Sequence, residues 1–302
     1  MSSVFFDRFD VGERVQFGAF CAIYRVKDRV TGQILALKIE KMESSYTILK
    51  YEYELTKQLQ DIPNIVCVYD YFENKTDKGF TMELLSNNLS DIRHLRRNPP
   101  SLSMLTYITK ECLLSLKEVH AKNVLHHDIK PSNFLIRFEN DDYRVVLIDF
   151  GLSVSLNEPE SISKFRYNLE QNPRYHSIDC YGNKNWTQRE DLVSLIYTIS
   201  DFWKDSLPWD GRMSARLIYE EKVKHSLESL LPPELSFLVT DLDKGTEYLY
   251  NEAEKLLQTM LRNIKEEIKY LTDPLDPGYK RKVADIVVEP ETKKKFKNQH
   301  SA

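Results

Sequence analysis

Apolar residues change their spacing along the chain, and this change separates a first part rich in strands from a second part rich in helices. Short runs of β-forming residues lie between 9 and 40, where Thr31-Gly32 marks a turn, and similar runs return at 65–73 and 79–85. The run from 34 to 40, Ile-Leu-Ala-Leu-Lys-Ile-Glu, predicts a strand that carries one basic residue. The first part is therefore expected to consist mainly of strands and turns.

The helical period appears first at 47–60 and then dominates from about residue 101. Ser101 is expected to cap a long helix through about Lys122, with apolar positions at 105, 108, 112, 113, 116 and 119. A further helix is predicted over 188–203, and the last predicted helices cover 213–230, 234–242 and 246–271. Asp191 lies among the apolar residues of 188–203, and the plain interpretation is a surface acid in the first helical turn.

Composition narrows the class of protein. The chain has 302 residues, 41% of them hydrophobic, which is enough for one large domain or two lobes. A net charge of −4 favours neither nucleic acid nor a membrane surface, and no apolar run approaches the ~20 residues of a membrane span. The four cysteines form no Cys-x-x-Cys pair, and residues 1–8 lack the apolar region of a signal peptide. We expect a monomeric cytoplasmic protein with reduced thiols, with the nucleus as the alternative location.

The strongest chemical signal is the stretch 126–133, His-His-Asp-Ile-Lys-Pro-Ser-Asn, together with Asp149-Phe150-Gly151 after a second apolar run. Each motif alone is common in loops and turns, but the two in this order suit phosphoryl transfer to a hydroxyl. Asp128 can accept the hydroxyl proton and Lys130 can meet the γ-phosphate. Asn133 and Asp149 supply the oxygen ligands that Mg²⁺ prefers.

This order of residues resembles the catalytic loop and metal-binding triplet of protein kinases. The same resemblance assigns Lys38, in Leu35-Ala36-Leu37-Lys38, to the strand lysine that grips the α- and β-phosphates and pairs with a helical glutamate. Glu52 and Glu54 both qualify as that partner, but they lie about 200° apart around a helix. Glu52 shares a side with Leu55 and Leu59, so Glu52 is predicted.

Several stretches are similar to the casein kinase 1 superfamily. They are Thr81-Met82-Glu83-Leu84-Leu85, Asp128 to Ile136, Ile148 to Leu152, Arg174-Tyr175-His176-Ser177-Ile178, Asp191 to Leu195 and Ser206-Leu207-Pro208-Trp209. The resemblance implies an α+β, bilobal kinase domain over 9–271, with a β-rich N-lobe (9–85) and a larger helical C-lobe (86–271). Residues 272–302 are expected to form an extension with a basic tail. ATP, Mg²⁺ and serine or threonine of acidic protein substrates are the implied ligands.

The resemblance also implies a set of site residues. Asp128 and Lys130 are the catalytic pair, and Asn133 and Asp149 hold the metal. The ATP-binding residues are Val15, Gly18, Ile23, Ala36, Lys38, Glu52, Met82, Glu83, Leu85 and Leu135.

The chain departs from this family in its glycine-rich loop. Gln16, Gly18 and Cys21 occupy the three glycine positions, so only the middle glycine is retained where backbone amides would approach phosphates. The family's Gly-Thr after the activation segment is Gln171-Asn172. Two functions therefore compete: an active serine/threonine kinase, favoured by the complete catalytic set, and a nucleotide-binding pseudokinase that serves as a scaffold.

A second departure concerns the cluster of basic side chains that holds a phosphorylated or acidic residue of the substrate in the family. His127 replaces the arginine of His-Arg-Asp, Arg174 is retained, and Ile218 replaces a lysine that precedes a tyrosine. An arginine binds phosphate with two parallel hydrogen bonds and stays charged, whereas a neutral histidine offers one donor. His127 and Arg174 are therefore predicted to form a weakened anion site.

Overall fold

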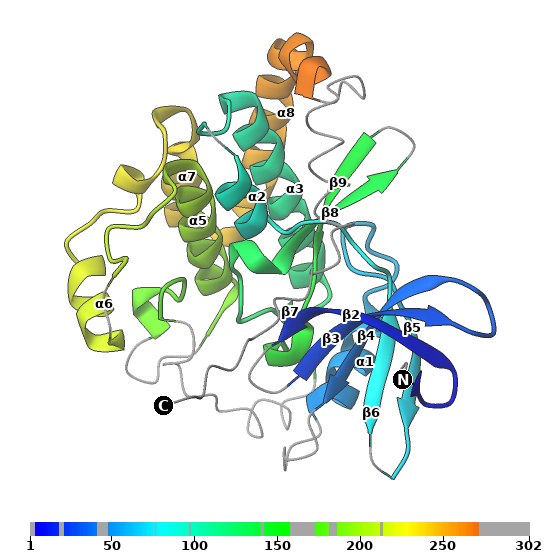
Figure 1. Cartoon of the computed structure of the whole chain (residues 1–302). Helices are drawn as coiled ribbons and strands as arrows, with labels where there is room; N and C mark the ends of the chain where they lie inside the picture. Colours follow the sequence, from blue (N-terminus) through cyan, green and yellow to red (C-terminus); the bar gives the residue numbers. More distant parts are fainter. Residues whose placement is uncertain are drawn as a thin grey trace, which may run out of the picture.

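The computed structural model describes residues 4–17, 21–40, 48–75, 77–96, 98–139, 142–157, 173–180, 186–211 and 214–271. A curled sheet with one helix forms a smaller lobe, and helices form a larger lobe beside it (Figure 1). The fold is the bilobal α+β arrangement expected from the sequence. The predicted glycine-loop residue Gly18, the departure at Gln171-Asn172 and the basic tail lie outside the described residues.

The small lobe is built on a six-stranded antiparallel sheet with the order β1-β2-β3-β4-β6-β5. In the register of this sheet, Lys38 lies opposite Ile23 on one neighbouring strand and opposite Phe80 on the other. Lys38 is thus fixed at the centre of the sheet, with paired strands on both sides. The strands are β1 (Val4–Phe5), β2 (Phe9–Phe17), β3 (Cys21–Asp28), β4 (Ile34–Glu40), β5 (Val68–Glu73) and β6 (Lys78–Met82).

One helix, α1 (Ile48–Gln58), covers a face of this sheet and contacts β5 and β6. Its buried residues are Leu49, Glu52, Leu55 and Thr56, so a carboxylate lies on the apolar side of the helix. The opposite face of the sheet buries a separate apolar cluster of Phe9, Val26, Leu35, Leu37 and Ile39.

The large lobe contains the long helix α3 (Leu102–Ala121), which packs against α8 (Thr246–Leu271). Ser101 caps α3 as predicted, because its side chain accepts a hydrogen bond from the backbone N–H of Met104 at 3.2 Å. Thr187 and Glu190 form a capping box at the start of α5. The remaining helices are α2 (Leu89–Leu95), α5 (Gln188–Lys204), α6 (Ala215–Lys222) and α7 (Phe237–Lys244).

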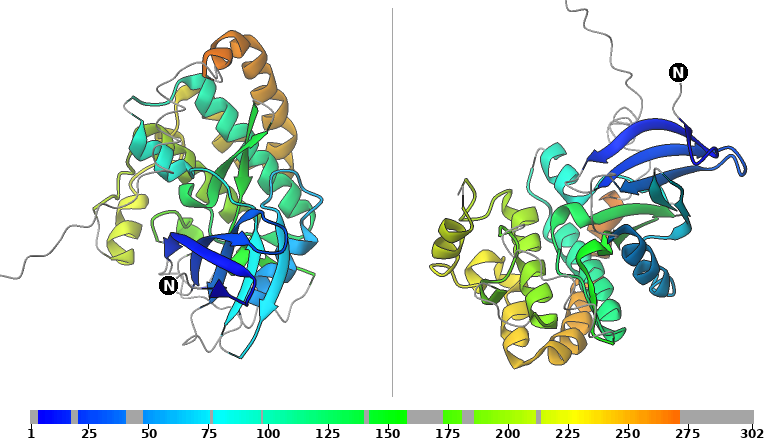
Figure 2. Two further views of the ribbon diagram at one scale, coloured as in Figure 1. Left: turned by 45° about the vertical axis from the view of Figure 1, so that its right-hand side comes forward. Right: turned by 90° about the horizontal axis from the view of Figure 1, so that it is seen from below.

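One hairpin and a second two-stranded pair lie at the junction of the lobes, where Figure 2 shows the hairpin in green. Strands β8 (Phe134–Glu139) and β9 (Asp142–Leu147) pair with each other, and Leu147 also bridges to Ile65 of the small lobe. The second pair is β7 (Val124–Leu125) with β10 (Val154–Ser155). These strands carry the ends of the two predicted catalytic motifs, and their pairing brings the motifs together.

Two predicted elements end earlier than the apolar pattern suggested. The helix expected over 213–230 stops at Lys222, where the chain changes to tighter turns: the N–H of Lys224 bonds to the carbonyl of Glu221, and that of His225 to the carbonyl of Lys222. The strand expected over 79–85 stops at Met82, where the chain leaves the sheet toward the second lobe.

Candidate active site

Lys38 joins two carboxylates from different parts of the chain. Its Nζ lies 2.6 and 2.7 Å from the two carboxylate oxygens of Glu52 and 2.8 Å from Oδ1 of Asp149. Lys38 and Glu52 are 7% and 3% exposed, so the pair is formed inside the protein. The choice of Glu52 over Glu54 therefore matches the geometry.

Burial and charge act in opposite directions on this cluster. Burial alone would lower the pKa of Lys38, but the charges of Asp149 and Glu52 raise it above its usual value. Burial raises the pKa of Glu52 to about 7 against the effect of the ammonium group. Burial would also raise the pKa of Asp149, but the charge of Lys38 lowers it below its usual range. Asp149 is therefore the firmly ionised carboxylate of the cluster.

Gly151 allows this close approach of helix α1 to the Asp149 turn. A Cβ atom at Gly151 would lie 3.2 Å from Oε2 of Glu52 and 3.4 Å from Oδ1 of Asp149. A Cβ atom there would crowd the Glu52 carboxylate, whereas the distance to Asp149 is an ordinary van der Waals contact. Asp149 itself has a left-handed backbone, with φ of 67°, which is uncommon for a residue other than glycine.

The catalytic-loop residues form a second compact group. Asp128 is buried, and its Oδ2 accepts hydrogen bonds from Lys130 Nζ at 2.5 Å and from Asn133 Nδ2 at 3.1 Å. Asn133 Nδ2 also donates to the backbone carbonyl of Asp128 at 2.8 Å. The three residues predicted from the motif are therefore assembled around one carboxylate.

His126 connects the catalytic loop to the strand that precedes Asp149. Its Nδ1 accepts from the backbone N–H of Asp128 at 3.2 Å, and its Nε2 lies 3.1 Å from the carbonyl of Ile148. This pairing defines a neutral ring protonated on Nε2, and burial lowers the pKa of His126 accordingly. The ring also packs edge-on against Phe150 at 4.9 Å.

The interpretation of Asp191 as a surface acid is wrong. Asp191 is 0% exposed, and its carboxylate accepts hydrogen bonds from the backbone N–H groups of His126 at 2.7 Å and His127 at 2.9 Å. It also accepts from Trp186 Nε1 at 3.2 Å and lies 3.0 Å from Nε2 of His120. Burial opposes ionisation, but the hydrogen bond with His120 lowers the pKa of Asp191 below its usual range. Asp191 thus holds the backbone of the catalytic loop by hydrogen bonds from within the large lobe.

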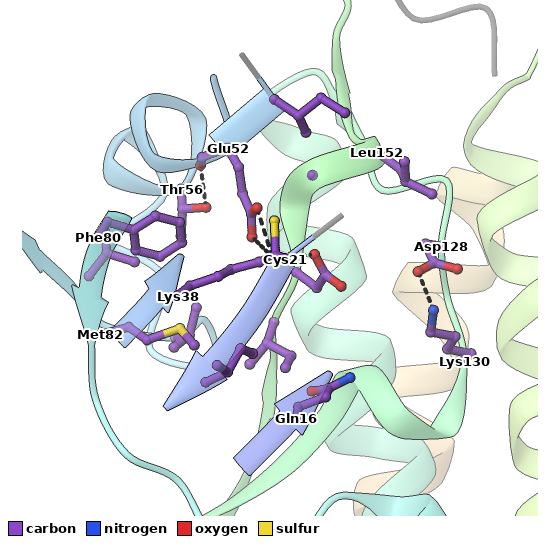
Figure 3. A pocket seen from close by; sticks show the side chains of 17 residues that line it. Gln16, Cys21, Lys38, Glu52, Thr56, Phe80, Met82, Asp128, Lys130 and Leu152 are labelled. Atoms are coloured by element: carbon purple, nitrogen blue, oxygen red, sulfur yellow. Dashed lines mark hydrogen bonds and ion pairs between the residues drawn. The ribbon is translucent and has the colours of Figure 1, made fainter. Parts of the chain in front are cut away.

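A pocket between the lobes joins the two groups (Figure 3). Lys38 and Glu52 lie on one side, and Asp128 and Lys130 lie across from them. Gln16 and Cys21, which occupy glycine positions of the family loop, both line this pocket. Burial raises the pKa of the Cys21 thiol to about 12, so the thiol stays protonated near neutral pH.

The predicted ATP-binding residues fall into two sets. Ile23, Lys38, Glu52 and Met82 line the pocket. The other described residues of the prediction, Val15, Ala36, Glu83, Leu85 and Leu135, are not part of its lining. Val15 is 53% exposed, and the Glu83 carboxylate is held by Arg137 and by the backbone N–H of Cys67.

Sequence reasoning missed a further part of the lining. Phe80 precedes Met82 by two residues on one strand, so strand alternation could have identified it. The others depend on how the lobes pack, which no local pattern records. They are Ile48, Thr56, Val66 and Val68, whereas Ile148, Gly151 and Leu152 belong to the stretch around Asp149 that the sequence had already indicated.

The two residues of the predicted anion site have other partners. His127 packs against the ring of Trp186, with centroids 4.4 Å apart, and burial lowers its pKa to about 4. One amino group of Arg174 donates to Asp201 at 2.8 Å and to Asp210 at 2.7 Å. Arg174 and Ile218 do line one surface pocket together with Asp210. The histidine is thus neutral at neutral pH, and the arginine is already paired with carboxylates.

Comparison with known proteins identifies the class. Residues 9–267 match the model of the protein kinase domain, and the chain belongs to that family. A probable serine/threonine-protein kinase of Dictyostelium discoideum is 30% identical over 265 residues, covering 85% of this chain and 53% of that protein. Casein kinase I homolog 3 of Schizosaccharomyces pombe is 30% identical over 214 residues, covering 68% and 48%. The chain spans about half the length of these relatives. No helix in the described part of the chain has the length and apolar character of a membrane span.

Proposed function

We propose that this protein is an ATP-dependent serine/threonine protein kinase of the casein kinase 1 type. The observation that carries the proposal is the double engagement of Lys38, whose Nζ contacts both Glu52 and Asp149 within 2.8 Å. A lysine held in this way presents a fixed positive charge beside the metal-binding aspartate. The domain is proposed to extend over 9–271, with 272–302 as an extension.

The donor set fits a magnesium–nucleotide complex. Asn133 uses its amide nitrogen on Asp128, which leaves its carbonyl oxygen as a hard ligand. Asp149 gives one carboxylate oxygen to Lys38, and its side chain is 35% exposed. Magnesium usually takes one or two protein oxygens together with substrate phosphates, and it neutralises phosphate charge when bound. Asn133 and Asp149 would hold it.

The remaining groups act on the acceptor. The Asp128 carboxylate would orient the serine or threonine hydroxyl and take its proton. Lys130, at 2.5 Å from Asp128, carries the charge that would meet the γ-phosphate. His126 and Asp191 hold the loop that carries both residues, so the geometry needs little rearrangement on binding.

The casein kinase 1 assignment rests on the motif resemblance and on the similarity to the fission yeast homolog. Protein serine and threonine hydroxyls are the proposed acceptors. The paired state of Arg174 and the neutral His127 give no support to a strong preference for acidic substrates.

One observation favours the pseudokinase alternative. Gln16 and Cys21 add side chains to the pocket lining where glycines would leave backbone amides accessible to phosphates. A nucleotide could then bind weakly, and the domain would serve as a scaffold.

Incubation with Mg²⁺, γ-labelled ATP and casein separates the two functions. A kinase labels casein on serine or threonine, and acid hydrolysis followed by phosphoamino-acid separation identifies the acceptor. A pseudokinase binds nucleotide in a fluorescence titration but leaves casein unlabelled.

A further inference from the structure

Lys222, the last residue of α6, lies inside the protein at 2% exposure. Its Nζ donates to the backbone carbonyl of Pro173 at 2.7 Å and to that of His176 at 2.5 Å. A lysine that donates to two carbonyls of one short segment holds that segment by its backbone, independently of its side chains.

Two aromatic rings complete the surroundings of this ammonium group. Nζ lies 4.6 Å from the ring centroid of Tyr197 and 5.0 Å from that of Trp209, and both rings attract a cation. Trp209 Nε1 also donates to the carbonyl of Arg174 at 2.8 Å. The side chains of Tyr197, Trp209 and Lys222, from α5, the intervening turn and α6, thus form one cage. Its Lys222 ammonium group and Trp209 N–H together donate hydrogen bonds to three backbone carbonyls of the 173–176 segment.

The cage supplies no carboxylate among the residues that the structure describes, and burial lowers the pKa of Lys222 to about 7. A buried lysine without a carboxylate is costly, and an apolar residue would fill the same space at a lower cost. Packing alone therefore does not account for a lysine here, whereas the two carbonyl contacts do.

The 173–176 segment is connected to the catalytic loop through Trp186. The ring of His176 packs edge-on against Trp186 at 5.0 Å, and Trp186 also packs against His127 at 4.4 Å. Trp186 and the backbone of His127 bond to the same oxygen, Oδ1 of Asp191. A shift of the segment would thus disturb the wall beside Asp128.

We propose that Lys222 is a positioning residue that fixes the 173–176 segment beside the catalytic loop and so sets the binding of the acceptor peptide. The effect on acceptor-peptide binding rests on the proposed kinase function. The fixing of the 173–176 segment rests only on contacts within the chain. Lys222 is not part of the lining of the pocket that holds Lys38 and Asp149, so its effect should be confined to the acceptor side.

The first test compares the effect of Lys222 on the binding of the acceptor peptide with its effect on the binding of ATP. In Lys222→Met, KM for a serine peptide should rise by about tenfold or more, the effect of losing one charged hydrogen bond, while KM for ATP stays unchanged. Lys204→Met is the matched control, because Lys204 lies on α5, donates to the carbonyl of Ser229 and stacks on Trp203. Unchanged peptide KM in Lys222→Met, or an equal rise for ATP, would overturn the proposal.

The second test does not require activity. Amide hydrogen exchange of a peptide covering 173–178 should be faster in Lys222→Met than in wild type, with exchange in α3 unchanged. Trp209→Phe keeps an aromatic ring, though a smaller one, but removes the N–H that donates to the carbonyl of Arg174, and should give an intermediate rate. If the wild type transfers no phosphate but the segment exchanges faster, the kinase proposal fails and the positioning contact stands. Unchanged exchange in both variants would refute the role of Lys222.

Discussion

The ammonium group of Lys38 lies 2.6 Å from Oε1 of Glu52, in a pair buried between a central strand and helix α1. The sheet fixes the lysine from both sides, and Leu55 shares the buried face of α1 with the glutamate. This pair is the contact through which the small lobe meets Asp149 of the large lobe.

Replacement of the lysine tests the electrostatic balance of this cluster. Lys38→Met should abolish phosphate transfer and destabilise the fold by roughly 3–5 kcal/mol, because Glu52 and Asp149 lose their shared cation. The loss of stability should be smaller at pH 6 than at pH 8. Burial raises the pKa of Glu52 to about 7, so this carboxylate is largely protonated in the folded state at the lower pH. The measurement is the midpoint of urea unfolding of wild type and Lys38→Met at both pH values. The exposed Lys50→Met on α1 is the control, and equal stability of the two variants would contradict the account.

A second prediction concerns acid stability. His127 has a pKa of about 4 in the fold, below its ordinary 6.5, because burial disfavours the charged ring. Between pH 6.5 and 4 the unfolded chain binds a proton that the folded chain does not, so stability should fall as pH is lowered through this window. The full effect is about 3 kcal/mol.

Replacement of the histidine isolates that contribution. His127→Asn removes the titrating ring and keeps a residue that tolerates the observed φ of 66°. Urea unfolding at pH 7 and pH 5 should show a smaller difference in this variant than in wild type. His225→Asn, near the surface beside Glu221, is the control and should keep the wild-type difference. An unchanged difference in His127→Asn would show that other groups cause the acid sensitivity.

The elements that could be predicted are those whose signal is local. The spacing of Leu55 and Leu59 predicts which side of α1 is buried, and Glu52 lies on that side. Ser101 predicts the start of α3, because its side chain caps the helix. The group around Asp128 spans only six residues of sequence, so the motif could be recognised without knowledge of the structure.

The parts that could not be predicted depend on distant partners. Asp191 holds the backbone of His126, 65 residues away, and the apolar spacing of its own helix does not distinguish it from a first-turn surface acid. Arg174 binds Asp201 and Asp210 of later elements, which removes it as a free cation for an anion site. The lining from Thr56 and Val66 likewise exists only once the lobes pack.

The altered glycine loop leads to a prediction about ATP. Gln16 and Cys21 line the pocket, and their side chains limit how closely the loop can approach phosphates. We predict weak ATP binding in wild type and tighter binding in Gln16→Gly with Cys21→Gly, measured by calorimetry with Mg²⁺. Arg14→Gly, on the same strand, controls for added backbone freedom. Unchanged or poorer affinity in the double variant would refute this explanation.

The two residues that were expected to form an anion site lead to a prediction about substrates. The ratio of kcat/KM for a peptide with phosphoserine three residues before the acceptor to that of its alanine version should be modest. His127 is neutral at neutral pH, and a phosphate must compete with Asp201 and Asp210 for Arg174.

Restoring charge should raise that ratio. His127→Arg with Ile218→Lys supplies two cations, although Ile218 is only 7% exposed and the lysine must extend toward the surface pocket. His94→Arg, on α2, is the control for added charge. A wild-type ratio of about a hundred or more, equivalent to roughly 2.8 kcal/mol, would show that an anion pocket survives.

Asp128→Asn shows whether the groups around Asp128 transfer phosphate. The measurement is the initial rate of γ-phosphate transfer to casein at saturating Mg²⁺-ATP, together with nucleotide affinity for both proteins. We predict slow but measurable transfer by wild type, at or below the ~1–100 s⁻¹ range of kinases, and loss of transfer in Asp128→Asn with nucleotide affinity nearly unchanged. A wild-type rate that does not exceed that of Asp128→Asn, on casein or on the protein itself, would contradict the kinase function.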